Sequence, residues 1–341
     1  MKSKIIGVGK YAPGEPISNE ELTKITGVEF DHEKFKLGLG IENRHIARLR
    51  GLDDTSADLA TKAAEDAIKN AGINPMDIDL FIVGSDTPEY ISPATAMLVQ
   101  GRIQKKQAGG AFDVAASCAS FTIAFDIANH FVKAGTYKTV CVTGVYAMPR
   151  FVKYDKYDKD AGFTVPIFAD GAGSVIIQRA ADNENSDYLA SQIIADGTQW
   201  DFIGVYAGGT RNPFTPENAG LLDEKKYGLE NLQPLPGDRN LKLWPPLTVD
   251  TLAKVGLKPD DVKLYVFTQI NKSVIKKVMA ELNQPIEKAV TVMDRYGYTG
   301  SGCVPMAFYH AVEDKRISRG DVVVFVASGS GFAVGCNVFK Y

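Results

Sequence analysis

The sequence contains one α/β segment twice, and this repeat constrains the fold more than any other feature. Residues 67–83 read AIKNAGINPMDIDLFIV, and 184 positions later residues 251–267 read TLAKVGLKPDDVKLYVF. Both segments have the pattern of a helix end, a glycine, a turn with proline and aspartate, and then an apolar strand. One match of this kind is also typical of an ordinary helix-to-strand connection, so it does not by itself indicate duplication.

A second match at nearly the same spacing favours duplication. Gly135 precedes an apolar segment at 139–143, and Gly320 precedes a similar segment at 322–327, about 185 positions further along. Repeats with so long a period do not form a solenoid. They indicate two copies of an α/β unit that pack against each other, because neither copy can cover its sheet alone.

The apolar segments also predict how the sheets are covered. Near-continuous apolar runs at 80–83 and 322–326 are typical of strands that are buried on both faces. We therefore expect an α/β fold of alternating layers, built from two halves at 1–177 and 178–341. Residues 205–247 are rich in Gly, Pro and Asn, and we expect them to form a long loop or cap.

Composition and charge exclude several classes of partner. The chain of 341 residues is 45% hydrophobic and 23% charged, which are the values of an ordinary folded protein. Its formal charge of −3 provides no general basic field, so we expect neither nucleic acid nor a membrane surface as a partner. No run of 18 apolar residues is present, and Pro13 interrupts the N-terminal segment before a signal peptide could form.

Among the four cysteines, Cys118 has the position of a nucleophile. It lies among small residues where an apolar strand passes into a helix, in the segment DVAASCASF at 113–121. Unpaired N–H groups at a helix start favour a thiolate, and small neighbours let a substrate approach. Cys141, Cys303 and Cys336 fit structural roles. The spacing of the four matches neither a zinc site nor a disulfide framework, so we expect no metal and a reducing, cytoplasmic setting.

Five motifs taken together resemble the β-ketoacyl-acyl-carrier-protein synthase III family, which has the thiolase fold. The resemblance extends from end to end of the chain. It implies an αβαβα layered fold, a homodimer, and a cysteine that takes an acyl group from a thioester before a malonyl-carrier thioester is decarboxylated and condensed onto it. The motifs are GIENRHIA at 40–47, PATAMLVQ at 93–100, the Cys118 turn, FADGAGS at 168–174 and GSGF at 329–332.

Two positions depart from the family pattern. The family has His-Gln-Ala-Asn where this sequence has TQIN at 268–271, and it has Gly-Asn-Thr where this sequence has Tyr298. Decarboxylation of malonate produces an enolate that needs two strong donors, and losing one such donor costs about 10²–10³ in rate. Replacement of both donors predicts weak condensation, although the hydroxyls of Thr268 and Tyr298 can each donate a hydrogen bond.

Other site residues follow from the same resemblance. It assigns the oxyanion hole of acyl transfer to the backbone N–H groups of Cys118 and Ser330. Asn271 keeps its family position and is a candidate to orient substrate or water, while a helix cap is an equally good interpretation. Lys276 and Lys277 follow on the helix that bears the carrier-protein patch in the family. They are candidates to contact acyl carrier protein or a coenzyme A phosphate, and a merely solvated surface is the alternative.

The sequence thus predicts an atypical acyltransferase that accepts an acyl group on Cys118 from acyl-CoA or acyl carrier protein, in fatty acid or related secondary metabolism. One alternative is a condensing 3-oxoacyl synthase in which Thr268 and Tyr298 substitute for His and Asn. Another is a non-catalytic partner subunit of a complete synthase. We expect no cofactor besides the thioester substrate, and a homodimer that pairs the edge strand at 111–114 across a two-fold axis.

Overall fold

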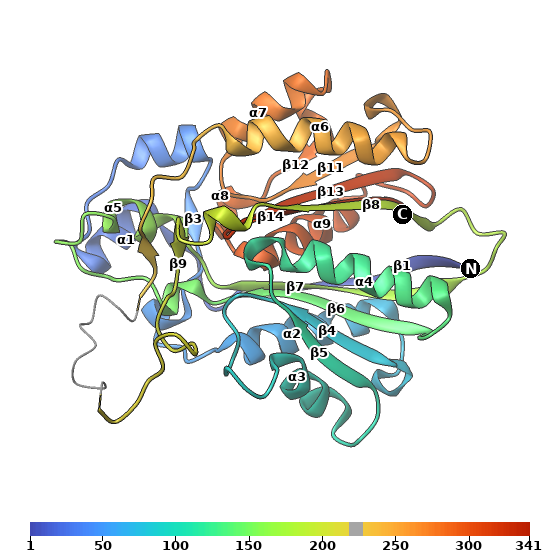
Figure 1. Cartoon of the computed structure of the whole chain (residues 1–341), viewed down its shortest axis with the longest axis horizontal. Coiled ribbons are helices and arrows are strands. Elements are labelled where there is room, and N and C mark those ends of the chain that lie inside the picture. Colours follow the sequence, from blue (N-terminus) through green and yellow to red (C-terminus); the bar gives the residue numbers. More distant parts are fainter. Residues whose placement is uncertain (218–227) are drawn as a thin grey trace.

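The computed structural model describes residues 1–217 and 228–341, in which layers of helices alternate with two five-stranded sheets (Figure 1). Helices cover the outer face of each sheet, and a further layer of helices lies between the sheets. The predicted αβαβα arrangement is therefore confirmed. The helices are α2 (Ser56–Ala71) and α3 (Thr95–Gln104) outside the first sheet, α4 (Ser120–Ala134) and α9 (Cys303–Glu313) in the middle, and α6 (Arg239–Ala253) and α7 (Lys272–Glu281) outside the second sheet.

The two sheets have the same strand order, which confirms that the fold consists of duplicated halves. The order is β1-β7-β6-β4-β5 in the first sheet and β8-β14-β13-β11-β12 in the second. In each sheet two antiparallel pairings are followed by two parallel ones. The strands are β1 (Lys2–Tyr11), β4 (Leu80–Gly84), β5 (Gly110–Val114), β6 (Thr139–Tyr146), β7 (Gly171–Ala180), β8 (Asp187–Ala195), β11 (Leu264–Phe267), β12 (Ala289–Val290), β13 (Val322–Gly329) and β14 (Ala333–Lys340).

The chain passes from the first sheet to the second between β7 and β8. The expected boundary between residues 177 and 178 lies inside β7, because that strand continues to Ala180 before β8 begins at Asp187. β1 pairs with β7, with Lys2 opposite Ala180 and Tyr11 opposite Ala172. The first sheet is thus complete before the chain enters the second.

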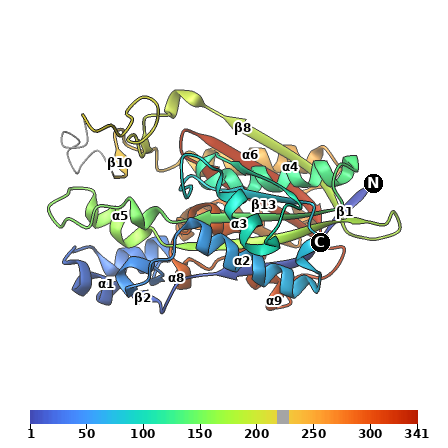
Figure 2. The same cartoon turned by 90° about the horizontal axis from the view of Figure 1, so that it is seen from below.

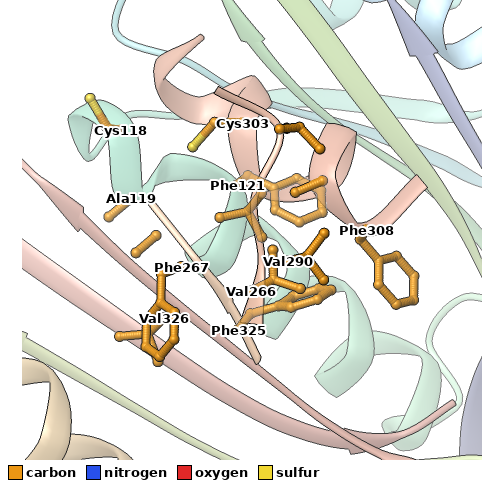
Figure 3. Packing of buried hydrophobic residues seen from close by; sticks show 14 of the residues in the cluster. Cys118, Ala119, Phe121, Val266, Phe267, Val290, Cys303, Phe308, Phe325 and Val326 are labelled. Carbon is orange, nitrogen blue, oxygen red and sulfur yellow. The ribbon is translucent and has the colours of Figure 1, made fainter. Parts of the chain in front are cut away.

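A cluster of aromatic side chains between the sheets holds α4 in place. Phe125 of α4 lies 5.4 Å from Phe325 of β13, and Phe308 of α9 lies 5.1 Å from the same ring, measured between ring centroids. Figure 3 shows this packing, with Phe121 beside it and Cys118 pointing away from the cluster. Each aromatic pair adds about 0.5–1.5 kcal/mol to the stabilisation from burial. Because α4 is clamped by both halves, the turn that precedes it is fixed as well.

A smaller group of elements lies at one end of the layers, seen at the left of Figure 1 and, from below, in Figure 2. Helices α1 (Asn19–Thr26) and α5 (Ala161–Ile167) belong to it. So do β9 (Ile203–Gly204) and β10 (Glu230–Asn231), which pair antiparallel. None of the helices in the described ranges has the length and apolar character needed to cross a membrane.

The expected loop at 205–247 is partly helical, which corrects the sequence prediction. α6 begins at Arg239 and contains Pro245 and Pro246 in its interior. Proline normally disfavours a helix interior, and for this reason the sequence suggested a loop. The helix forms nevertheless because its Trp244 is fully buried and stacks on Phe267 with a centroid distance of 5.2 Å. Residues 218–227 of the expected cap lie outside the described residues.

Candidate active site

The carboxyl ends of the central strands in both sheets meet around one cavity of about 300 Å³. Asp86 lies just beyond the end of β4, and Tyr146 ends β6. From the other half, Thr268 follows β11 and Gly329 ends β13. A crevice beyond the carboxyl ends of parallel strands is where layered α/β proteins commonly bind their ligands. The two halves therefore contribute to one candidate active site.

The structure brings together four of the residues predicted for the site. Cys118, Thr268, Tyr298 and Ser330 all line this cavity. They come from four separate segments of the chain, two of them at turns and two beyond strand ends. No histidine is found among the described residues that line the cavity.

Cys118 lies in a strained turn that both halves of the protein support. The turn Ser117–Ala119 connects β5 to α4, and Ser117 has a left-handed backbone with φ of +50°. This conformation costs a residue other than glycine about 1–2 kcal/mol. The carbonyl of Ser117 accepts hydrogen bonds from the hydroxyls of Ser120 at 2.5 Å and Ser301 at 2.7 Å. These two bonds offset the strain and fix the orientation of the cysteine.

The loop between β13 and β14 packs directly against this turn. A Cβ atom at Gly329 would lie 2.1 Å from the carbonyl oxygen of Ala116, so only glycine permits the approach. Next to it, the hydroxyls of Ser330 and Ser117 are 2.7 Å apart. The two residues that were predicted to form the oxyanion hole, Cys118 and Ser330, therefore reach the cavity from opposite halves.

The electrostatic environment of Cys118 differs from the sequence expectation. Burial, followed by the charge of Asp86, raises the pKa of the Cys118 thiol well above its ordinary value, and hydrogen bonds with Tyr298 and Tyr146 oppose this shift. The sulfur lies 4.0 Å from the Tyr146 Oη atom. The expectation that the helix start stabilises a resting thiolate is therefore wrong. α4 begins only at Ser120, so Cys118 lies in the turn ahead of the helix, and burial is the largest influence on its thiol.

Tyr298 is held in a cluster of three aromatic rings. Its ring centroid lies 5.9 Å from those of Tyr146 and Phe168. Its backbone N–H donates to the carbonyl of Ile167 at 2.9 Å. Burial, and then the neighbouring Cys118, raise the pKa of Tyr298 well above its ordinary value. The hydroxyl consequently stays protonated at neutral pH and is a hydrogen-bond donor in the cavity.

Thr268 is a second hydroxyl in the cavity wall. The side chain is buried, and its Oγ1 accepts a hydrogen bond from the backbone N–H of Ser328 at 3.0 Å. A hydroxyl that accepts in this way keeps its own proton for donation. Thr268 can therefore donate one hydrogen bond, but it cannot act as a base near neutral pH.

Sequence reasoning missed the acidic residue of the cavity. Asp86 follows β4, and burial raises the pKa of its carboxyl to about 6. Its Oδ1 atom is shielded from solvent and has no hydrogen-bond partner among the described residues. The sequence did contain a signal for this residue. Asp86 lies just beyond the apolar strand at 80–83, which is where a side chain can reach a ligand site at the carboxyl ends of the strands. Its counterpart 184 positions later, Ile270, also lines the cavity.

An arginine in the cavity was also missed. Arg239 begins α6, and its guanidinium lies over the ring of Phe332 at 4.9 Å and donates to Gln199 Oε1 at 3.2 Å. Burial lowers the pKa of Arg239, and the nearby Tyr298 and Cys118 oppose that shift. The prolines of α6 concealed this helix start, so the sequence offered no sign that Arg239 reaches the site.

Three predicted residues lie away from the cavity. Asn271 caps α7, where its Oδ1 accepts a hydrogen bond from the Val274 N–H at 3.1 Å, and it lines a separate pocket beside Phe35. Lys276 and Lys277 are exposed on α7. The structure thus supports the cap interpretation of Asn271, and any contact that the two lysines make belongs to the outer surface.

The fold and the site together define a class, the thiolase-fold enzymes that carry a cysteine between two duplicated halves. A family model described as 3-Oxoacyl-[acyl-carrier-protein (ACP)] synthase III matches residues 112–197, and the C-terminal model of that synthase matches residues 252–341. The beta-ketoacyl-[acyl-carrier-protein] synthase III of Aquifex aeolicus is 31% identical over 341 residues and is covered completely, as is this chain. The corresponding enzyme of Xanthomonas campestris pv. campestris is 34% identical, with 99% of this chain and 98% of the relative covered.

A solved structure gives the same result. The crystal structure of 3-oxoacyl-[acyl-carrier-protein] synthase III from Aquifex aeolicus VF5 has a TM-score of 0.84 and 30% identity, and the match covers 99% of this chain and 100% of the other. The chain therefore belongs to the beta-ketoacyl-[acyl-carrier-protein] synthase III family of condensing transferases. The resemblance inferred from the five sequence motifs is confirmed.

Proposed function

We propose that this protein is an atypical acyltransferase of its family, which forms an acyl-thioester on Cys118 from acyl-CoA or acyl carrier protein. One observation carries the proposal. The Cys118 turn and the Ser330 loop meet in the cavity, whereas the positions of the family's His and Asn hold the hydroxyls of Thr268 and Tyr298. The parts needed for acyl transfer are retained, and the strong donors needed for condensation are replaced.

In the proposed step, the Cys118 sulfur attacks the carbonyl carbon of the donor thioester. A new carbon–sulfur bond forms, the bond to the donor thiol breaks, and the free thiol leaves. The backbone N–H groups of Cys118 and Ser330 donate hydrogen bonds to the carbonyl oxygen and stabilise the negative charge that develops on it. Apolar side chains supply a surface for the acyl chain; they are Met148, Phe168, Ile203, Val205, Leu229, Leu235 and Ile270.

A second candidate function is condensation with malonyl thioester. It is favoured by the contact between Tyr298 and Cys118, because a protonated phenol beside the sulfur can donate to an enolate formed there. Thr268 supplies the second hydroxyl. Both of the family's donors are replaced, and the Thr268 hydroxyl is the weaker of the two substitutes, so we expect acyl transfer to be the faster half-reaction.

Intact-protein mass spectrometry tests the proposal. Incubation with short and medium acyl-CoA thioesters is expected to add one acyl group per chain, and Cys118→Ala is expected to abolish the addition. Cys303→Ala is a matched control, since Cys303 is also a buried free thiol but does not line the cavity. Release of carbon dioxide from malonyl-CoA reports condensation. A folded wild-type protein that no donor acylates would contradict the proposal and favour the partner-subunit alternative.

We propose a homodimer that forms through β5. This strand is the edge of the first sheet, pairs with β4 alone within residues 1–217 and 228–341, and is partly covered within one chain. Near it, Tyr90 and Ile91 are 55% and 81% exposed, so two large side chains adjoin this edge and are accessible to a second chain. Sedimentation at micromolar concentration is expected to give twice the 37.0 kDa of one chain. A single-chain mass would contradict this assembly.

We propose that Lys276 and Lys277 contact acyl carrier protein, which is acidic in the family that this chain resembles. Both lysines are exposed on one helix and leave that side of α7 positive. Changing both to Glu is expected to raise the KM for carrier-bound donors several-fold and to leave the KM for acyl-CoA nearly unchanged. Equal effects on the two donors would contradict a carrier-specific surface.

A further inference from the structure

Asp86 lines the Cys118 cavity, and one oxygen of its carboxyl, Oδ1, has no hydrogen-bond partner among the described residues, although the carboxyl also accepts a hydrogen bond from the Ser117 side chain. Asp86 follows Ser85, whose backbone N–H donates to the Val114 carbonyl at 3.1 Å and whose hydroxyl donates to the Val145 carbonyl at 2.9 Å. Three neighbouring strands therefore fix the position of Asp86. A polar atom that is buried and unpaired is unfavourable for folding, so its presence in an active-site wall calls for a functional explanation.

Acyl transfer at Cys118 requires a group that accepts the thiol proton. The thiolate is the nucleophile, yet burial keeps the Cys118 thiol protonated in the resting protein because its pKa is raised. Thr268 and Tyr298 are protonated hydroxyls, and Arg239 is a cation that retains its proton. A general base works best when its pKa lies near the working pH, and in this cavity the carboxyl of Asp86 meets that condition.

We propose that Asp86 accepts and returns the proton during acyl transfer at Cys118. This inference rests on the proposed function. As the sulfur bonds to the carbonyl carbon, its proton passes to the Asp86 carboxylate. When the bond to the donor thiol breaks, the departing thiolate takes that proton from Asp86 and leaves as a neutral thiol. Asp86 is ionised again at the end, so no further proton donor or acceptor is needed.

The mutual effect of the two groups agrees with this role. The negative charge of Asp86 raises the pKa of Cys118, so a carboxylate and a thiolate do not readily coexist in the cavity. Near neutral pH the thiol therefore holds the proton while Asp86 is ionised, so a proton donor and an acceptor are present in one cavity. Asp86, Ser117 and Ser330 also line a second, outer hollow. The titratable or charged groups that face Asp86 from the two cavities are Cys118, Tyr146, Tyr298 and Arg239 on one side and Tyr90 and Asp113 on the other.

The pH dependence of Cys118 acylation tests the inference. Rates of acyl addition are measured by rapid quenching and intact mass between pH 5 and pH 9, with a short acyl-CoA in excess. In the wild-type protein the rate is expected to rise through an apparent pKa near 6, because only ionised Asp86 accepts the proton. Asp86→Asn is expected to lower the rate by about 10²–10⁴ and to remove this rising limb of the pH–rate profile. Asp86→Glu is expected to keep the limb at a reduced rate.

Asp170→Asn is the matched control. Burial raises the pKa of Asp170 to about 7, and its Oδ1 also lacks a hydrogen-bond partner in the described ranges. Asp170 does not line the Cys118 cavity. This variant is expected to keep the wild-type rate and the wild-type limb. If Asp170→Asn loses the rise in rate near pH 6, that rise reports the ionisation of Asp170 and not of Asp86, and the inference is overturned.

Alkylation of Cys118 by iodoacetamide separates proton transfer from a structural role. Removing the negative charge of Asp86 lowers the pKa of the thiol, so Asp86→Asn is expected to be alkylated several-fold faster than wild type at pH 7. Acylation slows while alkylation accelerates, whereas a damaged site would slow both. Parallel slowing of the two reactions would overturn the inference.

Thermal melting confirms that the slow variant is folded. The folded protein disfavours the ionised form of Asp86, and this penalty is absent well below pH 3.8, where the carboxyl is protonated in both states, and is complete above about pH 6. Asp86→Asn is therefore expected to melt at a higher temperature than wild type at pH 8, with the difference shrinking toward pH 4. A folded Asp86→Asn that is acylated at the wild-type rate would overturn this inference alone, whereas a wild-type protein that no donor acylates would contradict the proposed function itself.

Discussion

The two walls of the Cys118 cavity are built in different ways. One wall is formed by the Cys118 turn and the Ser330 loop, whose backbones touch at Gly329. The other wall presents the side chains of Thr268 and Tyr298. A backbone N–H remains when a side chain changes, but a side-chain donor is lost with one substitution. The oxyanion hole proposed for acyl transfer therefore survives a change of side chain at Cys118 or Ser330, whereas the donors proposed for condensation do not.

The largest expected effect comes from disturbing the backbone wall. Gly329→Ala places a Cβ atom 2.1 Å from the Ala116 carbonyl oxygen, and the two backbones must separate to admit it. We expect the free energy of unfolding to fall by about 3 kcal/mol and Cys118 acylation to fall by about 10³-fold or more, because both N–H groups of the proposed oxyanion hole are displaced. Melting curves and intact mass measure the two effects. Gly101→Ala in α3 is the control, because it meets no atom within 4 Å and is expected to stabilise slightly.

An intermediate effect is expected from restoring the side-chain wall. Thr268→His combined with Tyr298→Asn supplies the donors that the family uses, and we expect carbon dioxide release from malonyl-CoA to rise about 10²-fold or more. The double variant should exceed the product of the single ones, because both donors hold one oxygen. Acylation of Cys118 should change far less. The measurement is carbon dioxide release by protein that is already acylated.

Packing must be controlled in this experiment. Tyr298 is buried against Tyr146 and Phe168, so its replacement by Asn leaves a cavity that costs about 2–4 kcal/mol. Tyr298→Phe keeps the ring and removes only the hydroxyl, and we expect it to lower any residual condensation without lowering the melting temperature much. If wild type already condenses malonyl-CoA as fast as the double variant, Thr268 and Tyr298 are competent donors and the acyltransferase proposal is wrong.

The smallest effect is expected at the edge between the walls, where Arg239 lies near Cys118. Arg239→Gln removes a positive charge that favours the thiolate, so alkylation of Cys118 at pH 8 should slow by about twofold to fivefold. The effect should shrink in high salt. Lys242→Gln on the same helix is the control, because Lys242 is exposed and paired with Asp238. Equal slowing in both variants would mean that the charge of Arg239 does not act on Cys118.

The fold was predictable because its signals are local. Apolar runs and helix-end glycines recur in the same order at one spacing, so the strands β4, β6 and β13 and the duplication follow from the sequence. Cys118 was predictable from its small neighbours, and Thr268 and Tyr298 from family positions. Asp86 and Arg239 were not predicted, because their place in the cavity depends on how distant strand ends and a proline-containing helix meet. The raised pKa of Cys118 depends on burial by many segments, which no local pattern records.

The burial of Cys118 affects how long an acyl group attached to it would last. Only 9% of its surface is exposed, and Val205, Leu229 and Leu235 line the cavity from the segment between β8 and α6. An acyl-thioester is lost by hydrolysis only when water reaches its carbonyl carbon. We therefore expect the proposed acyl group on Cys118 to be hydrolysed more slowly than one on an open surface, which would let the protein hold it until an acceptor arrives.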